Sequence, residues 1–103
     1  MIHVIATIEI QAGTRDQFLE EFHRIVPQVR AEEGCLEYGP CCDVATTLSI
    51  QPPVRENVVV VVEKWESLDA LYLHLEMPHM QDYKERVKDM VLSVLLHVLE
   101  PAA

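Results

Sequence analysis

A carboxylate, an indole and two imidazoles lie within one short stretch of this sequence, at Glu63, Trp65, His74 and His79. An imidazole titrates near neutral pH, where a general base is most effective, so His74 is the first candidate for a base. An indole can stack on an aromatic ring or donate its N–H to an oxygen atom. Few other parts of the chain combine these residue types, and the stretch is therefore the first candidate for a functional site.

Two predicted elements would bring these four side chains to one corner. Five consecutive valines, residues 58–62, favour a strand because branching at Cβ suits a pleated sheet, and a run this apolar predicts burial on both faces. Ser67 can cap a helix that follows, and Pro78 predicts that this helix ends and that His79 opens another. The apolar side chains of the first helix recur at helical spacing: Leu68, Leu71, Tyr72 and Leu75.

The composition limits the classes of protein to consider. With 103 residues, half of them apolar and 24% charged, the chain predicts one globular domain, residues 1–103. A net charge of −9 without a basic cluster argues against nucleic acid and anionic membranes as partners. The sequence contains no apolar run long enough to span a bilayer and no signal peptide at its start, so we expect a cytoplasmic protein.

Three cysteines, Cys35, Cys41 and Cys42, fit a reducing compartment better than a disulfide framework. Adjacent cysteines cannot easily both bind one ion, and no CxxC pair exists. We therefore expect these cysteines to have packing roles and expect no metal site.

The first third of the chain reads as a strand and a helix. Apolar residues alternate over residues 1–11, which predicts the first strand. Thr14 and Gln17 have the spacing of a capping box, Pro27 predicts a kink or local break, and Gly34 can end the helix in a left-handed conformation. The helix shows one apolar stripe: Phe18, Phe22, Ile25, Val26 and Val29.

The remaining segments complete a β-α-β-β-α-β order. Residues 35–44 read as a second strand, residues 45–56 as a loop, and residues 92–100 as the last strand. One further helix, before the last strand, would present a single apolar face formed by Met80, Tyr83, Val87 and Met90. This order predicts an α+β ferredoxin-like plait, with four antiparallel strands and helices on one face.

Such a plait leaves one face of its sheet without a cover. Residues 58–62 and 92–99 are apolar on both sides of their strands, so the uncovered face would be a large apolar patch. A second copy packed sheet to sheet would bury it. We therefore predict a homodimer.

Three motifs carry a resemblance to a known family: GCLEY at Gly34–Tyr38, EKWES at Glu63–Ser67 and HLEMPH at His74–His79. With the first strand and the length, they make the chain similar to the antibiotic biosynthesis monooxygenase family of dimeric α+β barrels, which includes small quinol monooxygenases. The resemblance implies no metal or organic cofactor. It also implies that an aromatic dihydroxy compound binds between sheet and helices and itself reduces molecular oxygen.

The resemblance assigns roles to the candidate residues. A quinol must lose a proton before it becomes a good electron donor, and His74 is the candidate base. Trp65 would stack on the substrate ring or donate to a substrate oxygen. His79, at the N-terminus of a helix, would bind the same oxygen and favour its negative charge.

Tyr38, Glu63 and Thr7 are the candidates for substrate binding. Tyr38 would contact a substrate oxygen, and Glu63 would orient an imidazole. Thr7 lies on the first strand, at the position where members of the haem-degrading branch of this fold carry an asparagine. Some oxygenating members carry an asparagine on the strand before the tryptophan, whereas this chain has Val59 and Val61 there.

Each candidate also has a structural interpretation. Trp65 would fill a core corner, His74 would be solvated or structurally bonded, His79 would cap a helix, Glu63 would be a structural acceptor, and Tyr38 would be a core residue. The competing function is a non-oxygenating module on the same scaffold, such as a signal-molecule isomerase or a stress-linked binding protein.

A cavity would separate the two functions. An enclosed, mostly apolar cavity with His74 or Trp65 in its wall favours the oxygenase, whereas space filled by Phe18, Phe22 and Tyr83 favours the structural interpretation.

Overall fold

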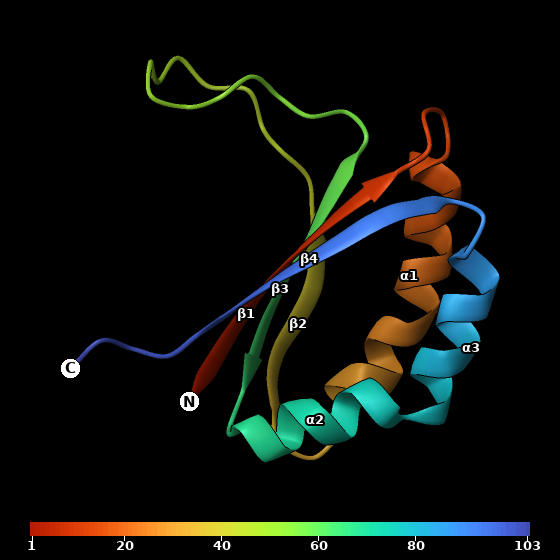
Figure 1. Cartoon of the computed structure of the whole chain (residues 1–103), viewed down its shortest axis with the longest axis vertical. Coiled ribbons are helices and arrows are strands. Elements are labelled where there is room, and N and C mark those ends of the chain that lie inside the picture. Colours follow the sequence, from red (N-terminus) through yellow and green to blue (C-terminus); the bar gives the residue numbers. More distant parts are fainter.

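The computed structural model describes residues 1–103 as a four-stranded antiparallel sheet with three helices on one side (Figure 1). In chain order the elements are β1 (Ile2–Ile10), α1 (Arg15–Arg30), β2 (Cys35–Cys41), β3 (Val58–Trp65), α2 (Leu68–Glu76), α3 (Pro78–Val87) and β4 (Val91–Leu99). The strands lie side by side in the order β2-β3-β1-β4. This confirms the ferredoxin-like α+β fold, with its second helical segment divided into α2 and α3. None of the helices combines the length and the apolar character that crossing a membrane requires.

The register of the strands decides which side chains face the helices. Ala6 of β1 lies opposite Val61 of β3 and Leu96 of β4, so these three side chains share the helix-covered face. Alternation places Thr7, with its partners Val60 and Leu95, on the other face. The helix-covered face packs against the whole predicted stripe of α1, which is buried: Phe18, Phe22, Ile25, Val26 and Val29.

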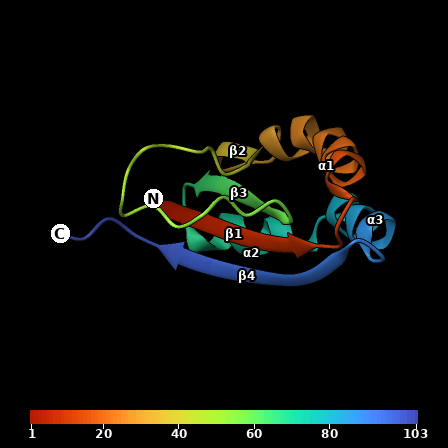
Figure 2. The same cartoon turned by 90° about the horizontal axis from the view of Figure 1, so that it is seen from above.

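The opposite face of the sheet has no cover within the chain. Figures 1 and 2 show α1 and α3 together along one side of the sheet and α2 across one end of it. Val62 is 37% exposed and Leu95 is 57% exposed. One chain therefore covers only one face of residues 58–62, and burial of the other face by a second copy stays a prediction.

The start of α1 differs from the predicted capping box. Thr14 donates its hydroxyl to the carbonyl of Gln11 at 2.6 Å, and its side chain makes no capping bond to the helix. The cause is local conformation: Thr14 has a ψ of 1°, whereas a capping residue is normally extended.

Pro27 does not break α1, which continues to Arg30. Pro27 and His23 are both exposed, so the His23 carbonyl that lacks a helical donor can be hydrated. The predicted local break is therefore absent.

The apolar stripe predicted for α2 is displaced. Leu71 and His74 are buried, while Tyr72 and Leu75 are exposed. This short helix packs against one end of the sheet (Figure 1), so that a narrower face meets the core. His74, predicted at the edge of the stripe, is instead central to the buried face.

Residues 42–57 form a long connection without helix or strand, as expected. β2 ends at Cys41, three residues before the predicted boundary. Asp43 accepts two hydrogen bonds from the Arg55 guanidinium, at 2.9 and 3.0 Å, which join the two ends of the connection. The connection projects away from the helices, on the side of the uncovered sheet face (Figures 1 and 2).

Candidate active site

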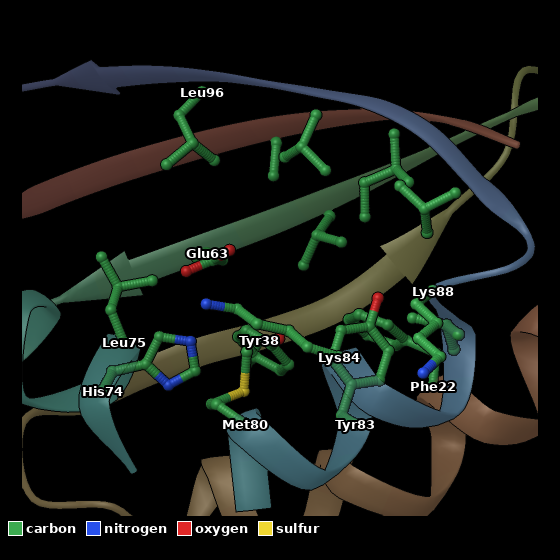
Figure 3. A pocket seen from close by; sticks show the side chains of 16 residues that line it. Phe22, Tyr38, Glu63, His74, Leu75, Met80, Tyr83, Lys84, Lys88 and Leu96 are labelled. Atoms are coloured by element: carbon green, nitrogen blue, oxygen red, sulfur yellow. The ribbon is translucent and has the colours of Figure 1, made fainter.

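A cavity of about 460 Å³ lies between the sheet and the helices (Figure 3). Twelve of its 16 lining residues are hydrophobic, so a ligand would meet mostly apolar walls. Four lining residues are charged or polar: Glu63, His74, Lys84 and Lys88. The cavity is open beside β4, whose Val94 and Leu96 line it and are exposed. The predicted cavity is thus present with His74 in its wall, although one chain alone does not enclose it.

His74 is held by its Nδ1 atom. Its side chain is 1% exposed, and Nδ1 lies 3.1 Å from each carboxylate oxygen of Glu32. A carboxylate accepts a hydrogen bond, so Nδ1 carries the proton in the neutral ring and Nε2 has a free lone pair. Nε2 makes no hydrogen bond within the protein. Every fully buried side-chain nitrogen has a hydrogen-bond partner, so Nε2 is not fully buried and is the ring atom that reaches the cavity.

Burial lowers the pKa of His74, and the hydrogen bond and charge of Glu32 oppose part of that effect. A neutral imidazole at physiological pH follows from the lowered pKa. His74 therefore presents a proton acceptor to the cavity.

Glu32 is a site residue that the sequence analysis missed. It lies in the turn after α1, with its side chain 6% exposed, and also accepts a hydrogen bond from His79 Nε2 at 2.6 Å. One carboxylate thereby joins this turn to both α2 and α3. A sequence signal was present: a carboxylate at the C-terminal end of a helix meets an unfavourable dipole and needs donors nearby.

Gly34 allows the turn that carries Glu32 to approach α2. Its φ is +84°, in the left-handed region as predicted, although α1 already ends at Arg30 with Ala31 as its C-cap. A Cβ atom at this position would lie 2.6 Å from the Cβ of Ala70. Both the backbone angle and the close approach therefore require glycine here.

Glu63 is the second buried carboxylate of the site. It lies on the helix-covered face of β3 and lines the cavity. Its Oε1 accepts the indole N–H of Trp65 at 2.9 Å, and Oε2 has no protein partner. Burial raises the pKa of Glu63 to about 7, the charge of Glu32 raises it further, and the indole hydrogen bond opposes them. The carboxylate that contacts both imidazoles is Glu32, whereas Glu63 contacts the indole of Trp65.

Trp65 lies behind the cavity wall. Its side chain is fully buried, its ring centroid is 4.6 Å from that of His74, and it is not a lining residue. Because its N–H is already donated to Glu63, the indole is not placed for the expected contact with a ligand. Trp65 instead supports Glu63 and His74 from behind the cavity wall.

Tyr38 lines the cavity from β2. Its ring stacks on Phe22 at 5.6 Å and meets His74 edge to face at 5.4 Å. Burial raises the pKa of Tyr38, so the phenol stays protonated. Its hydroxyl is available to donate to a ligand oxygen.

The two remaining candidates lie outside the cavity wall. His79 opens α3, as predicted, but its Nε2 is bound to Glu32 and it does not line the cavity. Thr7 faces the uncovered side of the sheet, since Ala6 and Ile8 take the cavity-facing positions of β1. Thr7 therefore does not line this cavity, and strand alternation is the reason.

Comparison with known proteins places this arrangement in context. Residues 1–86 match the family described as antibiotic biosynthesis monooxygenase. The chain is 41% identical over 103 residues to the "Probable quinol monooxygenase YgiN" of Escherichia coli strain K12, with 98% of each chain covered.

Solved structures share the fold. PA3566 from Pseudomonas aeruginosa has a TM-score of 0.80 at 24% identity, covering 99% of this chain and 94% of that one. Rv0793 from Mycobacterium tuberculosis also has a TM-score of 0.80, at 23% identity, covering 99% of this chain and 95% of that one.

Proposed function

This chain belongs to the antibiotic biosynthesis monooxygenase family, and we propose that it is a cofactor-independent monooxygenase acting on a quinol or a similar electron-rich phenol. The name of the 41% identical YgiN protein supports a quinol as the substrate class. The observation that carries the proposal is the placement of His74, whose Nδ1 is held by Glu32 while its Nε2 reaches a mostly apolar cavity.

The first step is removal of a proton from the substrate. In the proposed complex, a ring hydroxyl lies within hydrogen-bond distance of His74 Nε2, which takes the proton. The imidazolium that forms is stabilised by the Glu32 carboxylate behind it, as in other carboxylate–histidine pairs. The apolar walls exclude water and keep the ring anion reactive.

The second step uses the substrate as the reductant. The anion gives one electron to molecular oxygen, and the resulting radical pair combines to form a carbon–oxygen bond. Loss of water from the peroxide then leaves a hydroxylated quinone, so one oxygen atom enters the product and the other leaves as water. In this scheme the electrons come from the substrate and the protein supplies the base and the pocket.

Two other lining residues would position the substrate. The Tyr38 hydroxyl can donate to one substrate oxygen, and Glu63, with a pKa of about 7, can donate when protonated or accept when ionised. Trp65 and His79 act through their partners, Glu63 and Glu32, and are positioning residues in this scheme.

We also propose that two copies pair through the uncovered sheet face. The apolar side chains of β3 and β4 on that face, among them Val62 and Leu95, favour burial by a second sheet. Light scattering at micromolar concentration is expected to give twice the 11.8 kDa chain mass, and Val62→Lys is expected to give 11.8 kDa with the fold retained. A wild-type mass of 11.8 kDa would contradict the dimer.

Oxygen consumption with a panel of hydroquinones tests the activity. We expect uptake by the wild type and a loss of at least about 100-fold in His74→Ala, in the range for removal of a general base. His23→Ala is the matched control, because His23 is exposed on the far side of α1 and touches no part of the cavity.

The same assay distinguishes the monooxygenase from the competing function, a non-oxygenating module. Ligand binding without oxygen uptake for any member of the panel would favour the non-oxygenating module. Equal uptake by His74→Ala and the wild type would remove His74 from the mechanism.

A further inference from the structure

One basic side chain has no partner in the protein. The chain has 8 lysines and arginines against 17 acidic residues. Five of the eight form ion pairs with carboxylates: Arg24, Arg55, Lys64, Arg86 and Lys88. Arg15 and Arg30 donate to backbone carbonyls. Lys84 makes no hydrogen bond or ion pair, although acidic groups outnumber basic ones twofold in this chain.

The unpaired lysine lines the candidate cavity. Lys84 projects from α3, and Figure 3 shows its side chain crossing the cavity with the amine directed toward the side where Glu63 and His74 lie. Its positive charge lowers the pKa of His74, so its field reaches the candidate base. The cavity therefore contains one free cation among mostly apolar walls.

A second lysine in the same wall provides a comparison. Lys88 lies one helical turn after Lys84 and also lines the cavity, but its amine is 2.6 Å from a carboxylate oxygen of Glu85. Its charge therefore has a carboxylate partner, in a pair that is exposed to solvent. Of the two lysines in the cavity wall, Lys84 alone has no carboxylate partner.

We propose that Lys84 selects an aromatic ligand that carries a negative charge on the side facing α3. The inference rests on the proposed function, since it concerns the substrate of the same cavity. Two sources of charge fit: a ring oxygen ionised by His74, or a fixed carboxylate on the ring. In both, the ammonium and the anion attract each other beside apolar walls, where such attraction is stronger than in bulk water.

Binding of unreactive probes tests the selection without any oxygen chemistry. Trp65 is the single tryptophan and lies behind the cavity wall, so its fluorescence reports occupancy. The probes are 1-naphthoate, an anion, and 1-naphthalenemethanol, its neutral analogue. We expect wild type to bind the anion roughly three- to tenfold more tightly, in the range of an exposed ion pair, and the preference to shrink as salt is added.

Three variants assign the preference to one side chain. Lys84→Met keeps the length of the apolar stem but removes the charge, and it is expected to bind both probes equally. Lys84→Arg keeps the charge and the preference. Lys88→Met removes one charge at the C-cap of the same helix, from a lysine that is paired with Glu85, and its preference is expected to match that of the wild type.

A second arm distinguishes the two sources of charge. The visible absorbance of bound 4-nitrophenolate reports the pKa of a ring hydroxyl in the cavity. A pKa lowered by the wild type and not by Lys84→Met assigns the lysine to the ionised ring oxygen. A preference confined to naphthoate assigns it to a fixed carboxylate.

Failure of this inference is distinct from failure of the oxygenase. If the wild type shows neither a naphthoate preference nor a lowered nitrophenol pKa, or if both survive in Lys84→Met, the role of Lys84 is overturned. Oxygen uptake that depends on His74 would still stand in that case. Conversely, anion selection by Lys84 without oxygen uptake would leave this inference intact.

Discussion

The two regions around the buried carboxylates of this site are built differently. The Glu32 region is a turn, and its carboxylate accepts hydrogen bonds from two imidazoles on two helices. The Glu63 region is a strand in the middle of the sheet, and its carboxylate accepts one indole N–H and has a free oxygen. Both side chains are largely removed from water: the Glu32 side chain is 6% exposed and Glu63 is a buried residue.

The difference shows that partners as well as burial decide what a carboxylate can do. Burial favours the neutral acid unless donors stabilise the charge. Glu32 has donors for both oxygens and serves to hold imidazoles in place. Glu63 has too few, so its pKa rises to about 7 and it can gain or lose a proton near neutral pH.

The largest expected effect comes from Glu32→Gln. This change removes the charge that stabilises the His74 imidazolium, and oxygen uptake is expected to fall about 100-fold or more, by analogy with the carboxylate of a catalytic triad. Glu32 also raises the pKa of His74, so the acid limb of the pH–rate profile should move to lower pH. An unchanged rate and profile would show that Glu32 takes no part in the reaction.

Glu63→Gln tests the other carboxylate through stability. The pKa of Glu63 is raised from 4.5 to about 7 on folding, so its contribution is fully present below pH ~4.5 and is lost as pH rises through about 7. Wild type should lose on the order of 3 kcal/mol across this window through this group.

The Glu63→Gln variant is expected to lack this pH-dependent loss of stability. Urea unfolding at pH 5 and pH 8 measures it, with the pH dependence of the variant subtracted from that of the wild type. Parallel pH dependence in the two proteins would show that Glu63 ionises normally.

Trp65→Phe is expected to have a smaller, combined effect. It removes the hydrogen bond that lowers the pKa of Glu63, so the upper end of the pH window should move upward. The lost ring volume destabilises the fold at every pH by about 1–3 kcal/mol. Urea unfolding over a pH series separates the two terms, and Trp65→Phe in the Glu63→Gln background should retain only the second.

The smallest expected effect is that of His79→Ala. It removes one of the two donors to Glu32 Oε2, at a cost in stability of about 1–3 kcal/mol, while both contacts from His74 Nδ1 to Glu32 are retained. Oxygen uptake should fall by less than about tenfold. A loss as large as that of His74→Ala would give His79 a direct part in the reaction.

Local pattern made much of the fold predictable. The alternation in β1, the stripe of α1 and the Ser67 cap of α2 depend on neighbours within a few residues, and each is observed. Thr14 does not cap α1, because its hydroxyl donates to the carbonyl of Gln11, a contact that the spacing of a capping box does not predict. Tyr38, Glu63 and His74 were brought to the cavity as expected, whereas Thr7 was not.

The elements, the separation of two helices at Pro78 and the family resemblance can be read from the chain, because they follow from short-range sterics and residue order. The contacts of Glu32 with His74 and His79, which lie 42 and 47 positions further along the chain, arise only when the chain is folded. The folded structure also leaves Lys84, alone among the eight lysines and arginines, without a partner. Such pairings depend on how helices and turns pack against the sheet, and burial then requires each polar atom to find a partner or face a cavity.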